Sequence, residues 1–248
     1  MSKNDLGEVP FRNDGRLMVS YPKSGRTWID FAMKSHGIDL MLTHAGCSTN
    51  RREIGLPFRG IRSELSDLPL VFLHRDPIDT AVSMYHHVTH RDLKQGSGRY
   101  YRMVLPLLLR RALPPGNIDA FVLHPTHGIE KICRYNRAWL DHLAGRQDCL
   151  ILTYEEMRAA PDKGFQRLIT FFGLDGLTGS DLADASDFEK MTQAEMKGSR
   201  PEAGPGRKVR KGKVRGYLDE LTPETIAACQ SLMARFGFDA KPLSSPVP

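Results

Sequence analysis

The sequence is poor in the features that mark disulfide-bonded, zinc-binding or membrane-spanning proteins. Its 248 residues include four cysteines, Cys47, Cys133, Cys149 and Cys229. Because they form no close pair and no zinc-ligand spacing, we expect reduced thiols in a cytoplasmic protein. The amino-terminal stretch contains no apolar signal segment. The most hydrophobic run, 103–109, is interrupted by Pro106 and is too short for a bilayer. We therefore expect no membrane span.

The chain also lacks internal repeats and any shift in composition that would mark a second domain. We expect residues 1–248 to form a single domain, and 40% hydrophobic with 26% charged residues is typical of a globular protein. The formal net charge is +6. A basic protein of this kind suits nucleic acid, an anionic membrane or a compact anionic substrate. Six of the 35 Lys and Arg residues lie in 207–215.

A predicted strand, turn and helix occupy residues 16–37. The apolar run that starts at Leu17 predicts a buried strand, which Pro22 ends. A polar turn, 23–25, follows, and from Thr27 the apolar residues recur at helical spacing as far as Gly37. Unpaired N–H groups at the start of such a helix bind phosphate well. The alternative is an ordinary strand–helix turn with a solvated lysine.

Further short apolar runs at 38–43, 70–73 and 150–152 predict strands that alternate with helices. Asp76 and Pro77 predict a helix start, 129–143 and 165–172 predict amphipathic helices, and Thr222 predicts the cap of a last helix. This alternation indicates an α/β fold of three layers, with a mainly parallel sheet between helices. The carboxyl ends of parallel strands share one edge, so Lys23, His44 and Arg75 should meet there.

The turn differs from a Walker loop, since Lys23 precedes Gly25 and no glycine lies between residues 16 and 23. Residues 21–28 resemble the Tyr-Pro-Lys-Ser-Gly-Thr-Thr-Trp loop of sulfotransferases that use 3′-phosphoadenosine 5′-phosphosulfate (PAPS). Arg26 replaces the first threonine. In that family the loop holds the 5′-phosphosulfate. The resemblance implies a P-loop-NTPase-like fold and cofactor binding by Lys23, Ser24, Gly25, Arg26, Thr27 and Trp28.

A second segment, 75–86, is similar to the family's Arg-Asn/Asp-Pro-x-Asp-x-x-x-Ser-x-Tyr-His pattern. The similarity implies that Arg75 and Ser83 bind the 3′-phosphate, and a guanidinium offers a planar fork for phosphate oxygens. The alternative is an Arg75 that is paired with Asp79, beside a solvated serine.

A third segment, 209–217, resembles the Arg-Lys-Gly part of a loop that clamps the 3′-phosphate in the family. Its matching residues are Arg210, Lys211 and Gly212, whereas the later positions depart from the pattern. Basic runs are more often solvated faces or nucleic-acid patches. Glycines at 206, 212 and 216 exclude a continuous basic helix, so an anion-binding loop, about 199–217, fits better.

Weaker matches concern the adenine. Tyr154 begins a Tyr-Glu-Glu-Met stretch that resembles the family's Tyr-Glu-Asp-Met near the base. Phe188 resembles a phenylalanine that packs on the adenine, and Trp28 corresponds to the tryptophan on the other face of the base. Aromatic stacking suits any base. A lone phenylalanine is, however, more often a core residue.

His44 follows Thr43 as in the family's Thr-His pair, whose histidine removes the acceptor proton. Histidine suits this role because its ordinary pKa is about 6.5. The resemblance implies that Lys23 and Ser83 act with His44 in catalysis. Leu42 replaces a lysine that is common in the family. The alternative is a structural histidine at a strand end. The histidines at 86, 87 and 90 suggest a metal site only weakly, and we expect no metal.

The resemblance as a whole implies transfer of a sulfuryl group from PAPS to a hydroxyl, less readily an amine, of a small-molecule or saccharide acceptor. Adenosine 3′,5′-bisphosphate (PAP) would leave. We expect residues 88–128 on the acceptor side. A P-loop kinase would need a Walker lysine and a magnesium-binding aspartate, both missing here. A nucleic-acid-binding module would rest on the basic run alone, and we expect no nucleic-acid partner. The acceptor and the oligomeric state stay open.

Overall fold

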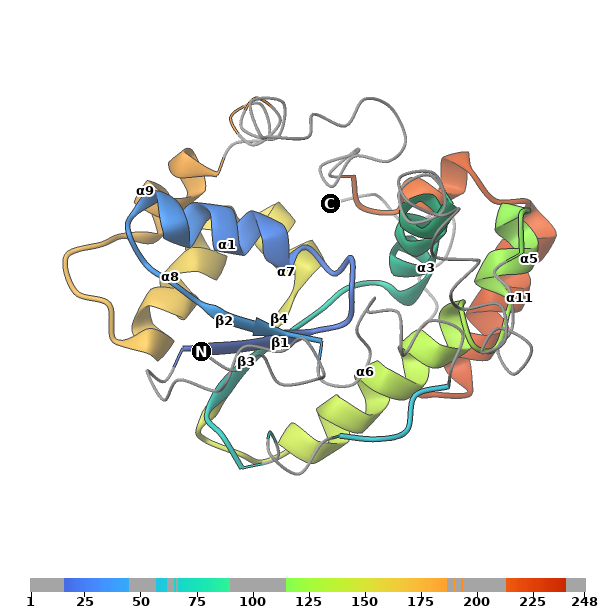
Figure 1. Ribbon diagram of the computed structural model, residues 1–248, viewed down its shortest axis with the longest axis horizontal. Helices are drawn as coiled ribbons and strands as arrows, with labels where there is room; N and C mark the ends of the chain where they lie inside the picture. Colours follow the sequence, from blue (N-terminus) through green and yellow to red (C-terminus); the bar gives the residue numbers. More distant parts are fainter. Residues whose placement is uncertain are drawn as a thin grey trace, which may run out of the picture.

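Four short strands form one parallel sheet at the centre of the molecule (Figure 1). The computed structural model describes residues 16–44, 57–61, 65, 67–89, 115–186, 190, 193 and 213–239. The strands are β1 (Leu17–Ser20), β2 (Met41–Thr43), β3 (Leu70–His74) and β4 (Cys149–Thr153). Their order across the sheet is β2-β1-β3-β4, and every pairing is parallel. The predicted α/β fold class is confirmed.

The strand order brings the functional segments to one edge. β1 lies between β2 and β3. After β1 the chain passes to one face of the sheet, and after β3 it passes to the other face. This reversal is the switch point where open α/β sheets bind ligands. In the register, Val19 pairs with Thr43, and Ser20 pairs with Leu73. The residues that follow these three strands therefore lie at the same carboxyl edge.

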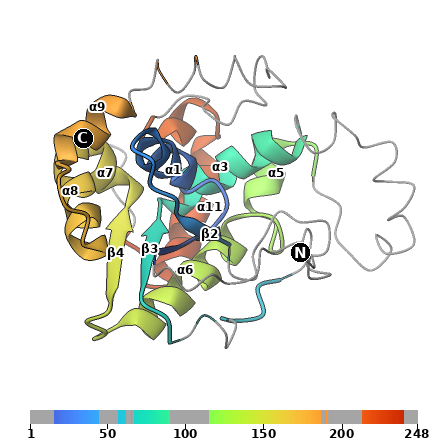
Figure 2. The same ribbon diagram turned by 60° about the vertical axis from the view of Figure 1, so that its left-hand side comes forward.

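Helices cover both faces of the sheet. One face carries α1 (Arg26–Ser35), α7 (Tyr154–Ala159), α8 (Pro161–Phe172) and α9 (Gly179–Ala185). The other carries α3 (Pro77–His87), α5 (Ile118–Val122), α6 (Ile129–Leu143), the 3₁₀ turn η3 (Gly216–Asp219) and α11 (Pro223–Ala234). In Figure 1, α1 and α7 lie on one side of the sheet and α6 on the other, and Figure 2 shows α8 beside β4.

The strands supply both cores because their side chains alternate between the faces. Val19 and Phe72 pack toward α6, whereas Met18 and Val71 pack toward α1 and α8. The α6 side is rich in aromatic residues, and the ring of Phe72 stacks on that of Trp139 with centroids 5.8 Å apart. Two buried layers of this kind hold the sheet, and hence the ends of its strands, in a fixed position.

Several predicted element boundaries are confirmed. Asp76 caps α3 by accepting N–H bonds from Ile78 (2.8 Å) and Asp79 (3.0 Å), and α6 spans the predicted residues 129–143. Two boundaries were predicted wrongly. β2 starts at Met41 instead of residue 38, and α8 starts at Pro161 instead of residue 165. The earlier start of α8 is explained by Pro161, because a proline at the first helical position lacks only an N–H that has no helical partner there.

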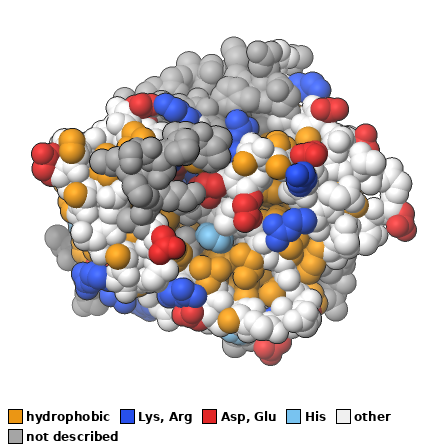
Figure 3. Space-filling view, turned by 180° about the vertical axis from the view of Figure 1, so that it is seen from behind, with side chains coloured by type: hydrophobic (Ala, Val, Ile, Leu, Met, Phe, Trp, Pro, Cys, Tyr) orange, Lys and Arg blue, Asp and Glu red, His pale blue; other side chains and the backbone are white. Residues whose placement is uncertain are grey.

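The surface carries charges of both signs. Figure 3 shows acidic and basic side chains interspersed over the rear face, with hydrophobic side chains gathered between them. Among the described helices, none has the length and apolar character that crossing a membrane requires.

Candidate functional site

The turn after β1 leaves backbone N–H groups at the start of α1 without helical partners. Ser24 N donates to Tyr21 O (3.3 Å), which closes the turn, and the first bond of the helix runs from Trp28 N to Gly25 O (2.9 Å). The N–H groups of Arg26 and Thr27 precede that bond, and no side chain caps the helix. Such N–H groups, at the positive end of the helix dipole, attract an anion.

The backbone of this turn is strained. Lys23 has φ 71° and Gly25 has φ 100°, both in the left-handed region. The other described non-glycine residue with positive φ is Arg215, at 57°, at the end of the basic segment. Left-handed backbone at a non-glycine residue costs about 1–3 kcal/mol and gathers at functional sites. Two of the three segments predicted to bind phosphate, 21–28 and 209–217, thus carry it.

The Ser24 hydroxyl is positioned for a bound oxygen. Ser24 is 1% exposed, and its Oγ has no hydrogen-bond partner within the described chain. A buried hydroxyl without a partner loses about 1–3 kcal/mol relative to one that is paired. A phosphate or sulfate oxygen in the turn would accept this hydrogen bond, so the turn fits an anionic group.

Gly25 lets an aromatic ring approach the turn. A Cβ atom at this position would lie 2.4 Å from Cδ2 of Tyr154, which is shorter than any tolerated contact. Glycine is therefore required both for the positive φ and for the space. The ring of Tyr154, at the first position of α7, forms one wall of the turn.

Arg75 joins four parts of the site. Its Nη1 donates to Lys23 O (3.5 Å) in the turn, and its Nη2 donates to Lys213 O (3.1 Å) in the basic segment, 207–215. The guanidinium lies over the Tyr154 ring, 4.4 Å from the centroid, and pairs with Asp79 at 3.5 Å. Arg75 Nε is buried without a hydrogen-bond partner in the described structure. The prediction that the β1 and β3 ends meet is thereby confirmed.

Asp79 holds the carboxyl end of the basic segment. Its Oδ2 accepts the N–H of Arg215 (2.7 Å), and its Oδ1 accepts that of Tyr217 (3.2 Å). The residue is 3% exposed, so these charge-assisted bonds form away from water. Residues 210–212, predicted to clamp the 3′-phosphate, lie outside the described residues, but the chain that follows them is fixed to α3.

Two further carboxyl groups lie beside Asp79. The Asp76 N–H donates to Glu155 Oε1 (3.0 Å), which ties the start of α3 to α7. Burial, together with the neighbouring Asp79 and Glu155 carboxylates, raises the pKa of Asp76 to about 7. Burial also raises the pKa of Glu155. The Arg75 guanidinium faces this acidic group, and its positive charge favours the ionised carboxylates.

The side predicted to hold adenine is built from packed aromatic rings. Trp28 is 8% exposed and meets Tyr154 and Phe165 edge-on, with centroids 6.0 Å and 5.6 Å away. Its Nε1 donates to Ser186 O (3.1 Å), close to Phe188 in sequence. Phe188 itself lies outside the described residues. The guanidinium of Arg158 lies 5.4 Å from the centroid of the Trp28 ring.

His44 is held in one tautomer by β1. Its Nδ1 lies 2.9 Å from Ser20 O, and a carbonyl oxygen can only accept, so Nδ1 carries the proton and Nε2 keeps its lone pair. Burial, followed by the Arg26 guanidinium, lowers the pKa of His44 to about 3. The imidazole is therefore neutral at physiological pH and able to accept a proton through Nε2.

Two other predicted site residues, Ser83 and Thr27, lie on the helices α3 and α1. Ser83 lies on α3, one helical turn beyond Asp79, and is half-buried. Thr27 is exposed at the start of α1. Most of the predicted acceptor-side region, 90–114, lies outside the described residues. The sequence did not single out the anchoring role of Asp79 or the carbonyl of Ser20. The role of Asp79 could have been inferred from its spacing, because it lies one helical turn after Arg75.

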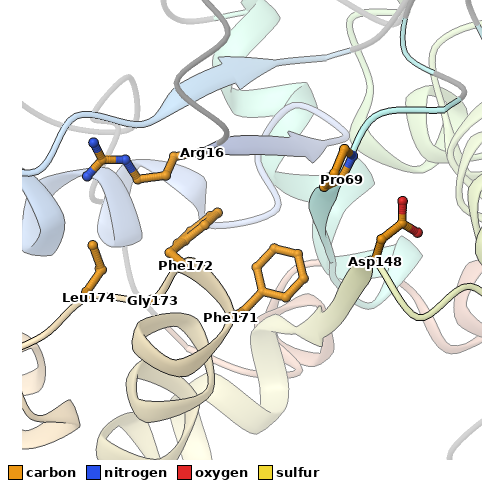
Figure 4. Close-up of a pocket in the computed structure, with 7 residues that line it drawn as sticks. All are labelled: Arg16, Pro69, Asp148, Phe171, Phe172, Gly173 and Leu174. Carbon is orange, nitrogen blue, oxygen red and sulfur yellow. The ribbon is translucent and has the colours of Figure 1, made fainter.

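A pocket of about 540 Å³ lies at the opposite edge of the sheet. It is lined by the residues that precede β1, β3 and β4, namely Arg16, Pro69 and Asp148, and by the end of α8, Phe171–Leu174. Figure 4 shows the two phenylalanine rings between Arg16 and Asp148. These residues precede the strands, whereas the site around Arg75 follows them at the carboxyl edge, where parallel sheets bind ligands. The pocket is therefore separate from that site.

No group of three His, Cys, Asp or Glu side chains with the arrangement of a metal site occurs within the described ranges. His86, part of the histidine cluster noted in the sequence, is hydrogen-bonded through Nε2 to Glu220.

Comparisons with known proteins agree with this arrangement. Solved structures similar to the chain include mouse sulfotransferase SULT7A1 complexed with PAP, at 17% identity and a TM-score of 0.58, with 90% of this chain and 84% of that chain covered. They also include retinol dehydratase in complex with androsterone and the inactive cofactor PAP, at 16% identity and a TM-score of 0.63, with 95% and 84% covered. These likenesses establish the fold. No curated protein sequence matches the chain.

A family model described as the sulfotransferase domain matches residues 55–237. The match begins after the turn at Lys23, so it is independent of the first motif, and it spans more than half of the 248 residues. The chain therefore belongs to the sulfotransferase-domain family.

Proposed function

We propose that the protein transfers a sulfuryl group from PAPS to the hydroxyl, less readily the amine, of a small-molecule or saccharide acceptor. The observation that carries this proposal is the meeting of the Lys23 turn, Arg75 and His44 at the carboxyl edge of the sheet. The solved structures described above contain PAP, which is the product that PAPS leaves after transfer.

The residues present fit such a donor. The uncapped start of α1 and the unpartnered Ser24 hydroxyl suit the 5′-phosphosulfate. Arg75, through its unpartnered Nε, and Ser83 suit the 3′-phosphate, with Arg210, Lys211 and Gly212 as further ligands. Trp28 and Tyr154, with Phe188, suit the adenine. PAPS supplies an activated sulfuryl group whose leaving group is a stable phosphate.

In the proposed reaction, His44 Nε2 takes the proton of the acceptor hydroxyl. The acceptor oxygen forms the new bond to sulfur, and the bond from sulfur to the bridging oxygen breaks, with its electron pair remaining on the 5′-phosphate of PAP. The Lys23 ammonium stabilises the negative charge that develops on that oxygen. Positioning and electrostatic stabilisation supply most of the rate in transfers of this type.

The low pKa of His44 is a property of the unliganded site. The Arg26 cation is one cause of it, and a bound phosphosulfate brings negative charge that opposes this cation. Donor binding should therefore raise the basicity of His44 when the acceptor is present. This coupling would confine proton abstraction to the complex that is ready to react.

The test begins with thermal unfolding in the presence of PAP, with 5′-AMP as the control that lacks the 3′-phosphate. PAP at about one hundred times its Kd should stabilise the folded protein by about 2.7 kcal/mol. For a chain of this length, that corresponds to roughly 5–11 °C. Equal stabilisation by 5′-AMP would refute the assignment of Arg75 and Ser83 to a 3′-phosphate.

The second part measures transfer of radiolabelled sulfate from PAPS over a panel of hydroxylated acceptors. With an accepted compound, His44→Ala should bind PAP normally and lose about 10²- to 10⁴-fold in turnover, the usual contribution of a positioned base. The acidic limb of the pH–rate profile should also vanish. A variant with normal turnover and an unchanged limb would exclude His44 as the base.

A further inference from the structure

Arg26 is a half-buried cation with no ion-pair partner among the described residues. It stands at the first position of α1, where the resembling loops have threonine, and its side chain is half-buried. Its Nη1 is buried without a hydrogen-bond partner, and within the described residues Arg26 forms neither a side-chain hydrogen bond nor an ion pair. Burial lowers the pKa of its guanidinium. A guanidinium is rarely buried unless it is paired, so this arrangement indicates an absent anionic ligand.

The acidic residue closest to this role, Asp30, has one oxygen paired and the other, Oδ1, buried without a hydrogen-bond partner in the described structure. Asp30 lies one turn further along α1 and interacts electrostatically with Arg26. Its Oδ2, however, is paired with Lys34 Nζ at 2.9 Å. The separation between Asp30 and Arg26 exceeds that of an ion pair, so Asp30 offsets only part of the Arg26 charge.

The Arg26 guanidinium acts electrostatically on His44. Its electrostatic partners include Tyr135, which belongs to α6 on the opposite face of the sheet from α1, and it acts on His44 at the end of β2. Tyr135 packs edge-on against Tyr21, with centroids 5.3 Å apart. The Arg26 guanidinium is therefore within electrostatic reach of both Tyr135 and His44.

The side chains assigned to the 3′-phosphate and the adenine lie elsewhere, whereas the backbone N–H of Arg26 belongs to the uncapped start of α1 that suits the 5′-phosphosulfate. Arg75 lies over Tyr154, which packs with Trp28 on the α7 and α8 side of the sheet. The phosphate groups of PAPS thus have their own ligands in the turn and around Arg75. An anion that pairs with Arg26 would stand next to His44, where the acceptor must present its hydroxyl.

We propose that the acceptor carries a carboxylate or phosphate group close to its reacting hydroxyl, and that Arg26 binds this group and so selects acidic acceptors. The inference rests on the proposed sulfuryl transfer. A charge-assisted hydrogen bond of this kind fixes the acceptor as well as selecting it, because a guanidinium and a carboxylate match in planar geometry. Binding of the anion would also offset the Arg26 charge beside His44.

The experiment compares matched acceptors that differ only in charge. The pairs are 2-hydroxyphenylacetate with its amide, and glucuronate with its amide. The quantity measured is the ratio of kcat/KM for the acid to that for its neutral partner. The proteins are the wild type, Arg26→Gln, Arg26→Lys and a control, Arg134→Gln, which removes an exposed arginine of α6 that pairs with Glu130. The same compounds are titrated into the PAP-bound proteins while the imidazole signal of His44 is followed by NMR.

In the wild type the acids should be favoured, and Arg26→Gln should reduce the acid-to-neutral ratio by about 10- to 100-fold, the value of a hydrogen bond between charged groups. Arg26→Lys should retain part of the ratio, and Arg134→Gln should retain all of it. Only the acids should shift the His44 signal, and only when residue 26 is cationic.

Three results would overturn the inference. The first is a wild type that shows no preference for acids in either turnover or NMR titration. The second is an Arg26→Gln variant that keeps the preference. The third is an equal loss for acid and neutral acceptors together with a weaker PAP affinity, which would assign Arg26 to the donor. PAP stabilisation of the wild type is measured in the same series, so a failure of the proposed function is recognised separately.

Discussion

Replacing Asp79 by asparagine tests whether the basic segment is held by one buried carboxylate. The substitution keeps the volume of the side chain but removes its charge. One oxygen can still accept a bond from Arg215 or Tyr217, whereas the new NH₂ group would face the other backbone N–H. Arg75, whose side chain is 12% exposed, would also lose its ion-pair partner.

The magnitude follows from these losses. A hydrogen bond to a charged group contributes about 1.5–3 kcal/mol, and removing one member of a buried pair costs about 3–5 kcal/mol. Part of this is offset, because the Asp79 charge is one cause of the raised pKa of Asp76. We expect Asp79→Asn to lower the free energy of unfolding by about 2–4 kcal/mol. The corresponding fall in Tm is roughly 4–16 °C.

The assay is urea unfolding, followed by calorimetric titration with PAP. The matched control is Asp141→Asn on α6, which removes an exposed carboxylate that pairs with Arg137 and should change stability by no more than about 0.5 kcal/mol. PAP affinity should fall at least tenfold in Asp79→Asn, because Arg75 and the segment before Lys213 lose their common support. An Asp79→Asn protein that is as stable as the control and binds PAP equally well would refute this account.

Two further predictions concern the turn and the pH dependence. Gly25→Ala should lose about 1–3 kcal/mol through its positive φ and also weaken PAP binding, because its Cβ would displace Tyr154. Gly37→Ala, with φ 72° and open space around the Cβ, should show the backbone cost alone in the same measurements. Burial lowers the pKa of His74 to about 4, below the unfolded value of about 6.5. Between these two values the unfolded chain binds more protons than the folded chain. The free energy of unfolding therefore falls as the pH falls through this window. Between pH 7 and 5, His74→Phe should therefore lose about 2 kcal/mol less stability than the wild type in urea unfolding, and identical pH slopes would contradict the lowered pKa.

The sequence predicted the elements with a strong period or a clear cap. α6 was predictable because Ile132, Tyr135 and Trp139 recur on one face over fifteen residues. α3 was predictable because Asp76 and Pro77 form a recognisable start. The short helices α5, α7 and α9 were not predicted, since five to seven residues are too few to establish a helical period.

The site was predictable where it depends on strand ends and not where it depends on distant contacts. Lys23, His44 and Arg75 each follow a strand, so a parallel sheet brings them to one edge. The bonds from Asp79 to Arg215 and Tyr217 join residues more than a hundred positions apart, and no local pattern indicates them. The tautomer of His44 likewise depends on the carbonyl of Ser20, which any residue type would provide.

Two interpretations of Arg75 compete at the level of sequence, and the structure shows one of them, the pair with Asp79, in a geometry that leaves room for the other. One assigned it to a phosphate, and the other paired it with Asp79. A guanidinium has five N–H donors in one plane. Those on Nη1 and Nη2 face Lys23 O, Lys213 O and Asp79, whereas the Nε donor is buried without a partner. The ion pair therefore does not compete with a phosphate. It fixes the plane of the guanidinium, and so determines the direction in which the Nε donor points.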